Sequence, residues 1–188
     1  MNRPFHQPMR FGYTLVEAAV VLVILGIAAT LLIPRLADRG DLEVQAATRQ
    51  LVADISWAQC DAVAGQGYRR LHFFEDGRGW CLLHVDEATF EEAFDPASAV
   101  YANDPWRTRR GDGDLIVDFV ADERFSEVMI SDVSLGGGRD LTFDRLGGTV
   151  SAPGLGAGPG SISLTDGQAV WNVELSPITG AVVVNRAQ

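Results

Sequence analysis

Residues 12–33 have the sequence GYTLVEAAVVLVILGIAATLLI, and this stretch decides the expected fold of the N-terminal part of the chain. Its one ionisable side chain is Glu17, and residues 18–33 carry no charge. An apolar stretch of roughly 20 residues has the length that a helix needs to cross the hydrocarbon core of a bilayer. We therefore predict a transmembrane helix over residues 13–34.

The leader that precedes this stretch, residues 1–12, carries Arg3 and Arg10 and no acidic side chain. Basic residues next to a transmembrane helix favour the cytoplasmic side. We therefore expect the leader to stay in the cytoplasm and the remainder of the chain to be exported.

Three interpretations of this N-terminal segment compete. A Sec signal peptide would end at an A-x-A cleavage site, and none follows the apolar stretch at a suitable distance. A plain signal anchor leaves Glu17 unexplained, because a carboxylate within an apolar span costs roughly 3 kcal/mol and usually has a partner. In the third interpretation, cleavage after Gly12 creates an α-amine on Tyr13, and this cation pairs with Glu17 of a neighbouring subunit.

The residues from Gly12 to Glu17, the apolar helix behind them and Pro34 after it resemble the prepilin signal of type IV pilins and type II secretion pseudopilins. Tyr13 stands where that family more commonly has Phe. The resemblance implies that a prepilin peptidase cleaves after Gly12 and N-methylates Tyr13. It also implies that Glu17 and Pro34 serve subunit assembly, and that the helix first lies in the lipid bilayer and later in the core of a filament.

A second helical pattern begins at Asp41, a suitable N-cap, and ends before Gly65 and Gly67. Pro34 predicts a kink between the two patterns, and Gly40 is a second weak point. A helix over residues 14–65 would be roughly 75 Å long. Its amphipathic half has one apolar stripe at spacings of three and four, which consists of Val44, Thr48, Leu51, Ile55, Ala58 and Ala62.

The remainder of the chain has the pattern of β-strands. Residues 68–74 and 80–85 flank the turn EDGRG, which is a strong hairpin signal. Further short strands are expected at residues 115–120, 128–130, 141–143, 161–164, 170–175 and 180–184, with long loops at 86–114 and 147–160. We therefore predict an α+β, pilin-like fold in which one long N-terminal helix packs on an antiparallel sheet within a domain of residues 35–188.

The segments LTFDRLGG, SISLTDG and WNVELSPITGAVVV resemble the GspH/FimT type of minor pseudopilin. The resemblance implies an H-type minor pseudopilin of a type II secretion system, near the tip of a short filament that helps to export folded proteins across the outer membrane. The implied partners are other minor and major pseudopilins, the prepilin peptidase and the inner-membrane secretion platform. The implied location is the inner membrane, with a single pass and the C-terminal domain in the periplasm.

Two other functions stay open on the sequence. One is a FimT-like minor pilin of a type IV pilus, serving pilus assembly, adhesion or DNA uptake. The other is a membrane-anchored periplasmic domain that binds a ligand. Neither requires catalysis, and the sequence lacks a G-x-S-x-G motif, a P-loop and a dinucleotide fingerprint. We therefore expect no enzyme and no cofactor.

Histidine and acidic residues offer no clear metal site. His72 and His84 lie on the two arms of the expected hairpin, where an ordinary cross-strand pair is the preferred interpretation. Asp112 and Asp114 lie in a Gly-rich loop, but the spacing of a calcium-binding EF-hand is absent, which favours a solvated acidic loop. We therefore predict no bound metal.

Charge argues against a nucleic-acid partner. The 188 residues hold 25 acidic and 15 basic side chains, which gives a net charge of −10, and every basic residue is Arg. An acidic surface repels phosphate backbones. The one basic cluster consists of Arg107, Arg109 and Arg110, and the acidic residues that follow it favour a salt-bridged loop. Alternatively, Trp106 beside the cluster could anchor a contact with another protein.

The chain has two cysteines, Cys60 at the end of the second helical pattern and Cys81 in the second arm of the hairpin. Export would place both in an oxidising compartment, where a disulfide between them could form if the hairpin packs under the helix end. Free buried cysteines are the alternative, and the sequence leaves both open.

Overall fold

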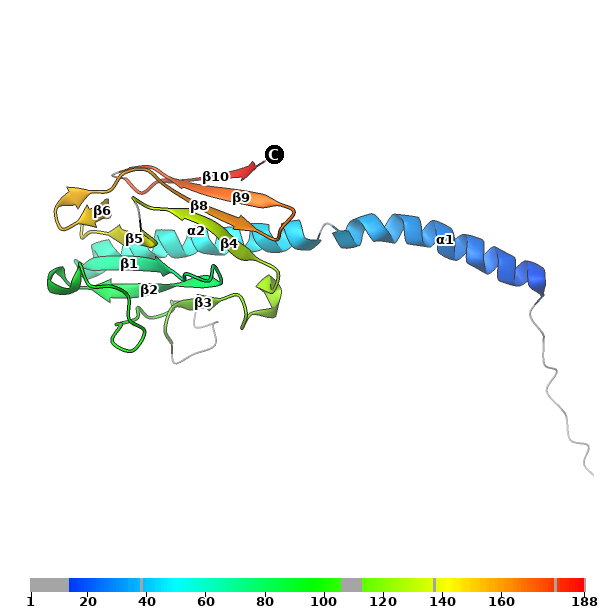
Figure 1. The fold of residues 1–188 in the computed structure, drawn as a ribbon, viewed down its shortest axis with the longest axis horizontal. Helices are drawn as coiled ribbons and strands as arrows, with labels where there is room; N and C mark the ends of the chain where they lie inside the picture. Colours follow the sequence, from blue (N-terminus) through cyan, green and yellow to red (C-terminus); the bar gives the residue numbers. More distant parts are fainter. Residues whose placement is uncertain (1–13, 38, 106–112, 137, 178, 188) are drawn as a thin grey trace, which may run out of the picture. The chain divides into compact units, whose positions relative to one another are not determined.

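The computed structural model describes residues 14–37, 39–105, 113–136, 138–177 and 179–187, with the backbone alone at 31–37, 39 and 40. Contacts within the chain divide it into two compact units, Met1–Arg39 and Gly40–Gln188. The first unit holds α1 (Leu15–Ala37), and α2 (Arg39–Gly65) begins at the boundary. The two helices are separate elements in the chain (Figure 1).

A kink or interruption was expected at Pro34. The helix α1 continues through Pro34 and ends at Ala37, so Pro34 does not end the helix. A proline removes one backbone donor, but a helix can bend around it and go on. Asp41 is likewise not the N-cap of α2, because that helix begins at Arg39 and Asp41 lies in its first turn. Gly40 lies within α2 as well.

In the part of the chain that the structure describes, no helix is long and apolar enough to span a membrane. This finding contradicts the predicted transmembrane helix over residues 13–34, and with it the predicted single pass through the inner membrane and the periplasmic placement of the domain. A bilayer-spanning helix needs about 20 apolar residues. Among the described side chains of α1, Glu17 follows Leu15 and Val16, so a charged residue stands within the apolar segment.

The helix α2 forms one wall of the core of the second unit. The six side chains of the expected apolar stripe are all at most 2% exposed, which confirms the stripe: Val44, Thr48, Leu51, Ile55, Ala58 and Ala62. The apolar members of this stripe belong to one buried cluster together with side chains from both sheets, such as Phe73, Trp80 and Ile162.

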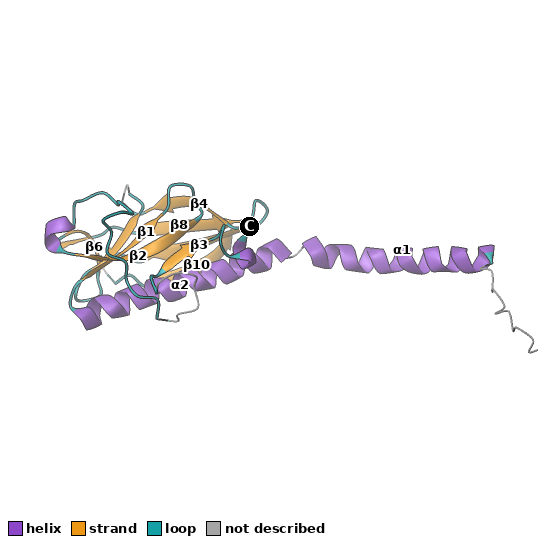
Figure 2. Ribbon diagram, turned by 90° about the horizontal axis from the view of Figure 1, so that it is seen from below, coloured by secondary structure: helices purple, strands orange, loops and turns teal. Residues whose placement is uncertain are grey.

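Ten strands follow α2 and form two antiparallel sheets in the described residues (Figures 1 and 2). The six-stranded sheet has the order β3-β2-β1-β5-β6-β7. Its strands are β1 (Tyr68–Phe73), β2 (Gly79–Val85), β3 (Ile116–Asp118), β5 (Asp140–Phe143), β6 (Thr149–Ala152) and β7 (Leu155–Gly156). The four-stranded sheet has the order β10-β9-β8-β4. Its strands are β4 (Met129–Ser134), β8 (Gly160–Thr165), β9 (Val170–Leu175) and β10 (Val182–Ala187).

The hairpin expected around EDGRG is confirmed, with β1 and β2 paired antiparallel and Phe73 opposite Trp80. The loop expected at 147–160 is wrong in part, because β6 and β7 lie within it and pair with β5 and with each other. Short extended segments in Gly-rich sequence become strands when a neighbouring strand supplies the hydrogen bonds.

The predicted fold class is therefore corrected. The described residues form two α-helices in place of one long apolar and amphipathic helix, and two antiparallel sheets in place of one sheet domain. Strands account for most of the regular structure after residue 65. Apolar periodicity could indicate that each helical stretch is helical, but it does not determine whether consecutive stretches join into one element.

Candidate functional site

The first candidate site is the start of α1, where Thr14 caps the helix. The backbone N–H of Glu17 donates to Thr14 Oγ1 at 3.2 Å, and the N–H of Ala18 donates to the Thr14 carbonyl at 3.1 Å. Glu17 lies in the first turn, where the helix dipole favours a negative charge. The negative charge of Glu17 therefore stabilises the helix locally, whether or not the side chain also has a partner on another molecule.

The described side chains of α1 form an apolar and exposed surface. Its large hydrophobic residues are between 46% and 87% exposed: Leu15, Val16, Val20, Val21, Leu22, Val23, Ile24, Leu25 and Ile27. Glu17 is the one charged side chain among residues 14–30. Exposed apolar patches of this kind mark contact sites for other molecules.

Three other residues of the predicted prepilin signal and its helix cannot be placed in this way. Gly12 and Tyr13, the predicted cleavage and N-methylation site, lie outside the described residues. Pro34 lies in α1, where only the backbone is described. Their roles stay predictions from the sequence.

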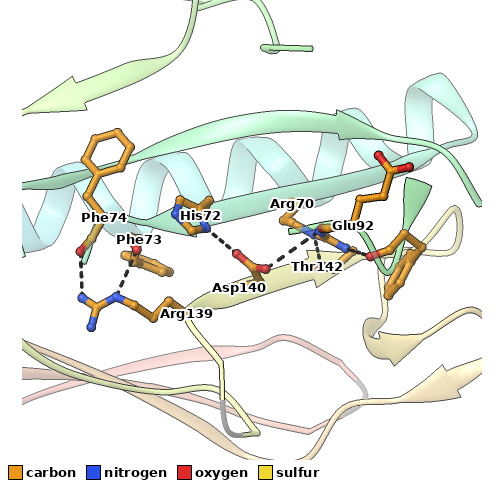
Figure 3. Close-up of polar contacts among 9 residues, drawn as sticks. Arg70, His72, Phe73, Phe74, Glu92, Arg139, Asp140 and Thr142 are labelled. Atoms are coloured by element: carbon orange, nitrogen blue, oxygen red, sulfur yellow. Dashed lines mark hydrogen bonds and ion pairs between the residues drawn. The ribbon is translucent and has the colours of Figure 1, made fainter. Parts of the chain in front are cut away.

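The second candidate site is a polar cluster on β1 and β5, in the second unit (Figure 3). Leu71 and Phe73 belong to the core beside α2, so strand alternation directs Arg70 and His72 to the other face of the sheet. The register places Thr142 opposite Arg70 and Asp140 opposite His72.

Arg70 is 6% exposed and is held by several acceptors. Its Nε donates to Thr142 Oγ1 at 3.2 Å, its Nη2 to the carbonyl of Phe90, and its Nη1 to the carbonyl of Glu92 at 3.4 Å. Its Nη1 also lies 3.9 Å from a carboxylate oxygen of Asp140. The guanidinium therefore connects β5 with the chain segment that follows β2.

The carboxylate of Asp140 is shared between two partners. Its other oxygen lies 2.7 Å from Nδ1 of His72, whose ring stacks on Phe94 with the centroids 4.1 Å apart. Next to it, Arg139 donates to the carbonyls of Phe73 and Phe74 at 3.1 and 2.9 Å (Figure 3). The cluster thus fixes the buried guanidinium of Arg70. Its nearest acid, Asp140, is half-exposed and already in contact with His72.

The predicted cross-strand pair of His72 and His84 is wrong. The register places Cys81 opposite His72 and Arg69 opposite His84, so the two imidazoles lie on opposite faces of the sheet. Burial and the neighbouring Arg69 lower the pKa of His84, although Asp61 and Asp86 act in the opposite direction. The hairpin signal gave the two strands, but the register of the turn decided which side chains are neighbours.

The two cysteines are free, so the disulfide considered from the sequence is absent. Trp80 faces α2, and strand alternation turns its neighbour Cys81 to the opposite face, away from Cys60 on α2. Burial, together with the charge of Asp140, raises the pKa of the Cys81 thiol to about 12.

Within the described residues, no group of three or more His, Cys, Asp or Glu side chains is placed to hold a metal ion. The backbone of Asp114 forms an isolated antiparallel β-bridge with Asn103, whereas Asp112 lies outside the described residues. The basic cluster of Arg107, Arg109 and Arg110 lies outside them too, as does Trp106.

Sequence reasoning missed the cluster around Arg70. The signal was present in YRRLHFF, where Arg69 and Arg70 interrupt an otherwise apolar strand pattern. Both prove to be buried, and Arg69 pairs with Asp61 of α2. Charged residues at strand positions that turn out to be buried need partners, so adjacent arginines in a strand deserve to be treated as candidates for a polar cluster.

Comparison of the chain with protein-family models, with curated proteins and with solved structures found no match.

Proposed function

We propose that this chain is a structural subunit of a filament, an H-type minor pseudopilin of a type II secretion system that helps to export folded proteins. The single observation that carries the proposal is the surface of α1. Its large apolar side chains are exposed over the described length, with Glu17 as the sole charge. Such a surface is stable in water only when another apolar surface covers it.

The sequence supports the same conclusion at the start of the helix. Gly12, Tyr13 and Glu17 carry the resemblance to prepilin signals, and Thr14, which lies between them, caps the first turn of α1. Cleavage after Gly12 would leave a mature chain that begins one residue before this cap. The partners in this proposal are a prepilin peptidase, which makes the cut, and other minor and major pseudopilins, whose helices cover α1.

A matched pair of variants tests the proposal. Val23 on α1 is 62% exposed and Val183 on β10 is 54% exposed, so glutamate is accommodated in the isolated chain at either position. The full chain is co-expressed with the other pseudopilins and the peptidase, and co-purification is measured in detergent. We expect Val23→Glu to abolish co-purification and Val183→Glu to leave it unchanged.

Two results would contradict the proposal. One is equal co-purification of both variants with the pseudopilins, which would show that α1 is not the contact surface. The other is an intact mass that still includes residues 1–12 when the peptidase is active, because a pseudopilin requires the cut after Gly12. Co-purification with the components of a type IV pilus, and not with the pseudopilins, would identify the chain as a subunit of that other filament.

A further inference from the structure

A pocket with a volume of about 350 Å³ lies where the two sheets of the second unit meet. Arg70, Asp140 and Thr142 line it from the six-stranded sheet, and Gly160 and Leu175 line it from the four-stranded sheet. Ligand sites in proteins have volumes of roughly 300 to 1,000 Å³, so this pocket can hold a small molecule or one to two residues of a peptide.

Arg70 gives the pocket a buried positive charge. A guanidinium has five N–H donors, and the described residues accept three of them, through the carbonyls of Phe90 and Glu92 and the hydroxyl of Thr142. The nearest carboxylate, Asp140, is 3.9 Å away and lies 2.7 Å from His72 through its other oxygen. The guanidinium is therefore fixed in place with donors left for an incoming acceptor.

The remaining lining suits a small apolar group. Leu135, Val150 and Leu175 are among the lining residues and have aliphatic side chains, and glycines leave room in the walls. Gly158 is one of them, and a Cβ added there would meet no other atom within 4 Å.

Acidic side chains limit how much negative charge the pocket accepts. Glu91 and Glu92 are exposed and line it, and Figure 3 shows the Glu92 carboxylate turned away from the Arg70 guanidinium. Two exposed carboxylates in the lining repel an anion with several charges more strongly than an anion with one. A single carboxylate also matches the planar fork of a guanidinium, with which it can form two parallel hydrogen bonds.

We propose that this pocket binds a carboxylate carried by a small aliphatic group, with the Arg70 guanidinium as the anchor and the leucines and Val150 around the aliphatic part. The carboxylate belongs to the C-terminal residue of a peptide or to a free acid of the same chemistry. This inference uses only residues of the second unit and does not depend on the proposed filament function.

Calorimetric titration of the full chain in mild detergent tests the inference. The probes are N-acetyl-leucine, its amide, inorganic phosphate, and a tripeptide that ends in leucine with either a free or an amidated C-terminus. We expect N-acetyl-leucine to bind at least about tenfold more tightly than its amide and than phosphate. The amide is neutral and its terminal group has one oxygen acceptor for the two free donors, and phosphate carries more negative charge, which Glu91 and Glu92 repel more strongly. If the tripeptide with a free C-terminus binds more tightly than N-acetyl-leucine, the ligand is the end of a peptide chain. If the two bind equally, the ligand is a free acid.

Two variants assign the binding to this pocket. Arg70→Lys keeps the charge and removes the fork, and we expect about a tenfold loss of affinity for N-acetyl-leucine. Gly158→Leu adds a bulky side chain to the lining of the pocket and leaves Arg70 unchanged, and we expect it to abolish binding. Ala46→Leu introduces the same side chain at an exposed position of α2 and serves as the control. If Arg70→Lys does not fold, Gly158→Leu decides the question.

Three outcomes would overturn the inference. They are an absence of binding by every carboxylate probe, equal affinity for the acid and its amide, and unchanged affinity in folded Gly158→Leu. The filament proposal is unaffected by any of these, since it is tested by Val23→Glu on a different unit of the chain.

Discussion

The indole Nε1 of Trp80 in β2 donates a hydrogen bond to the carboxylate of Asp54 in α2 across 2.9 Å, and both residues are fully buried. Gln50 donates to the other oxygen of the same carboxylate at 3.2 Å. A buried carboxylate is costly unless hydrogen bonds compensate for the lost water. The pair therefore fixes the position of α2 against the six-stranded sheet as well as filling the core.

Trp80→Phe should destabilise the second unit by about 3 kcal/mol, because it removes ring volume and leaves a buried carboxylate without one of its donors. Trp171→Phe is the matched control, since its Nε1 donates to Asp41 at the same distance of 2.9 Å but at a half-buried site. Water can replace the donor there, so we expect a smaller loss, of about 1 kcal/mol. Urea unfolding of both variants measures the difference, and equal losses would show that the buried bond adds nothing beyond packing.

Gly79 has a backbone φ of +149°, and a Cβ added there would lie 1.9 Å from the carbonyl oxygen of Val117 in β3. Gly79→Ala should therefore separate β2 from β3 and cost about 2 kcal/mol or more. Gly158→Ala is the control, since its Cβ would meet no atom within 4 Å, and we expect a change within about 0.5 kcal/mol. Thermal unfolding of the two variants checks this, and a small effect of Gly79→Ala would mean that the β2–β3 pairing adapts easily.

The cysteines should differ in reactivity because Cys60 is exposed and Cys81 is buried. We expect iodoacetamide to modify one thiol in the folded chain and two after unfolding without a reductant. Mass spectrometry of digested fragments should assign the first modification to Cys60. Failure to label either thiol in the unfolded, unreduced chain would instead demonstrate the disulfide.

Alkaline pH should destabilise the chain through Cys81. The pKa of this thiol is raised from 9.0 to about 12 in the folded state, so the unfolded state loses its proton first. The stability that the folded state gains from this raised pKa is fully present below pH 9 and is lost between pH 9 and about 12. Between pH 8 and 10 we expect a loss of about 1 kcal/mol in the free energy of unfolding.

Cys81→Ala should abolish that part of the alkaline loss, and Cys60→Ala should retain it. The comparison uses the change in unfolding free energy between the two pH values, since Cys81→Ala also alters packing at every pH. The same alkaline loss in both variants would assign the effect to other groups.

The sequence predicted those parts of the fold that depend on neighbours along the chain. The stripe from Val44 to Ala62 was correct because helical spacing alone places these side chains on one face. The hairpin around EDGRG was correct because the turn and both strands are local. The strands β6 and β7 were missed because their hydrogen bonds come from β5 and from each other, and the segment itself is rich in glycine.

The candidate sites show the same division. The apolar character of α1 and the position of Glu17 could be predicted, since both are properties of one short segment. The adjacent arginines in YRRLHFF indicated a polar cluster, but the partners of Arg70 could not be predicted, because Thr142 lies 72 positions away in the sequence and Phe90 lies 20 positions away. The role of a charged residue in a strand depends on which acceptors the fold brings to it.

Glu17 has two physical explanations that predict different results. As an acid in the first turn of α1, it stabilises the helix locally through the dipole, an effect worth about 0.5 kcal/mol. As the partner of a Tyr13 α-amine on an adjacent subunit, it would hold two subunits in register, and each charge would compensate for the lost hydration of the other. The filament proposal requires the second explanation.

Glu17→Gln removes the charge and keeps the size, and we expect it to reduce co-purification with the other pseudopilins by about tenfold while cleavage after Gly12 continues. Thr14→Ala is the control, because it removes the cap, at a cost of about 1 kcal/mol to the helix, and leaves the carboxylate in place. Pairing between subunits predicts a large effect of Glu17→Gln and a small effect of Thr14→Ala. Equal losses in the two variants would show that Glu17 acts only on its own helix, and undiminished co-purification of Glu17→Gln would refute the pairing.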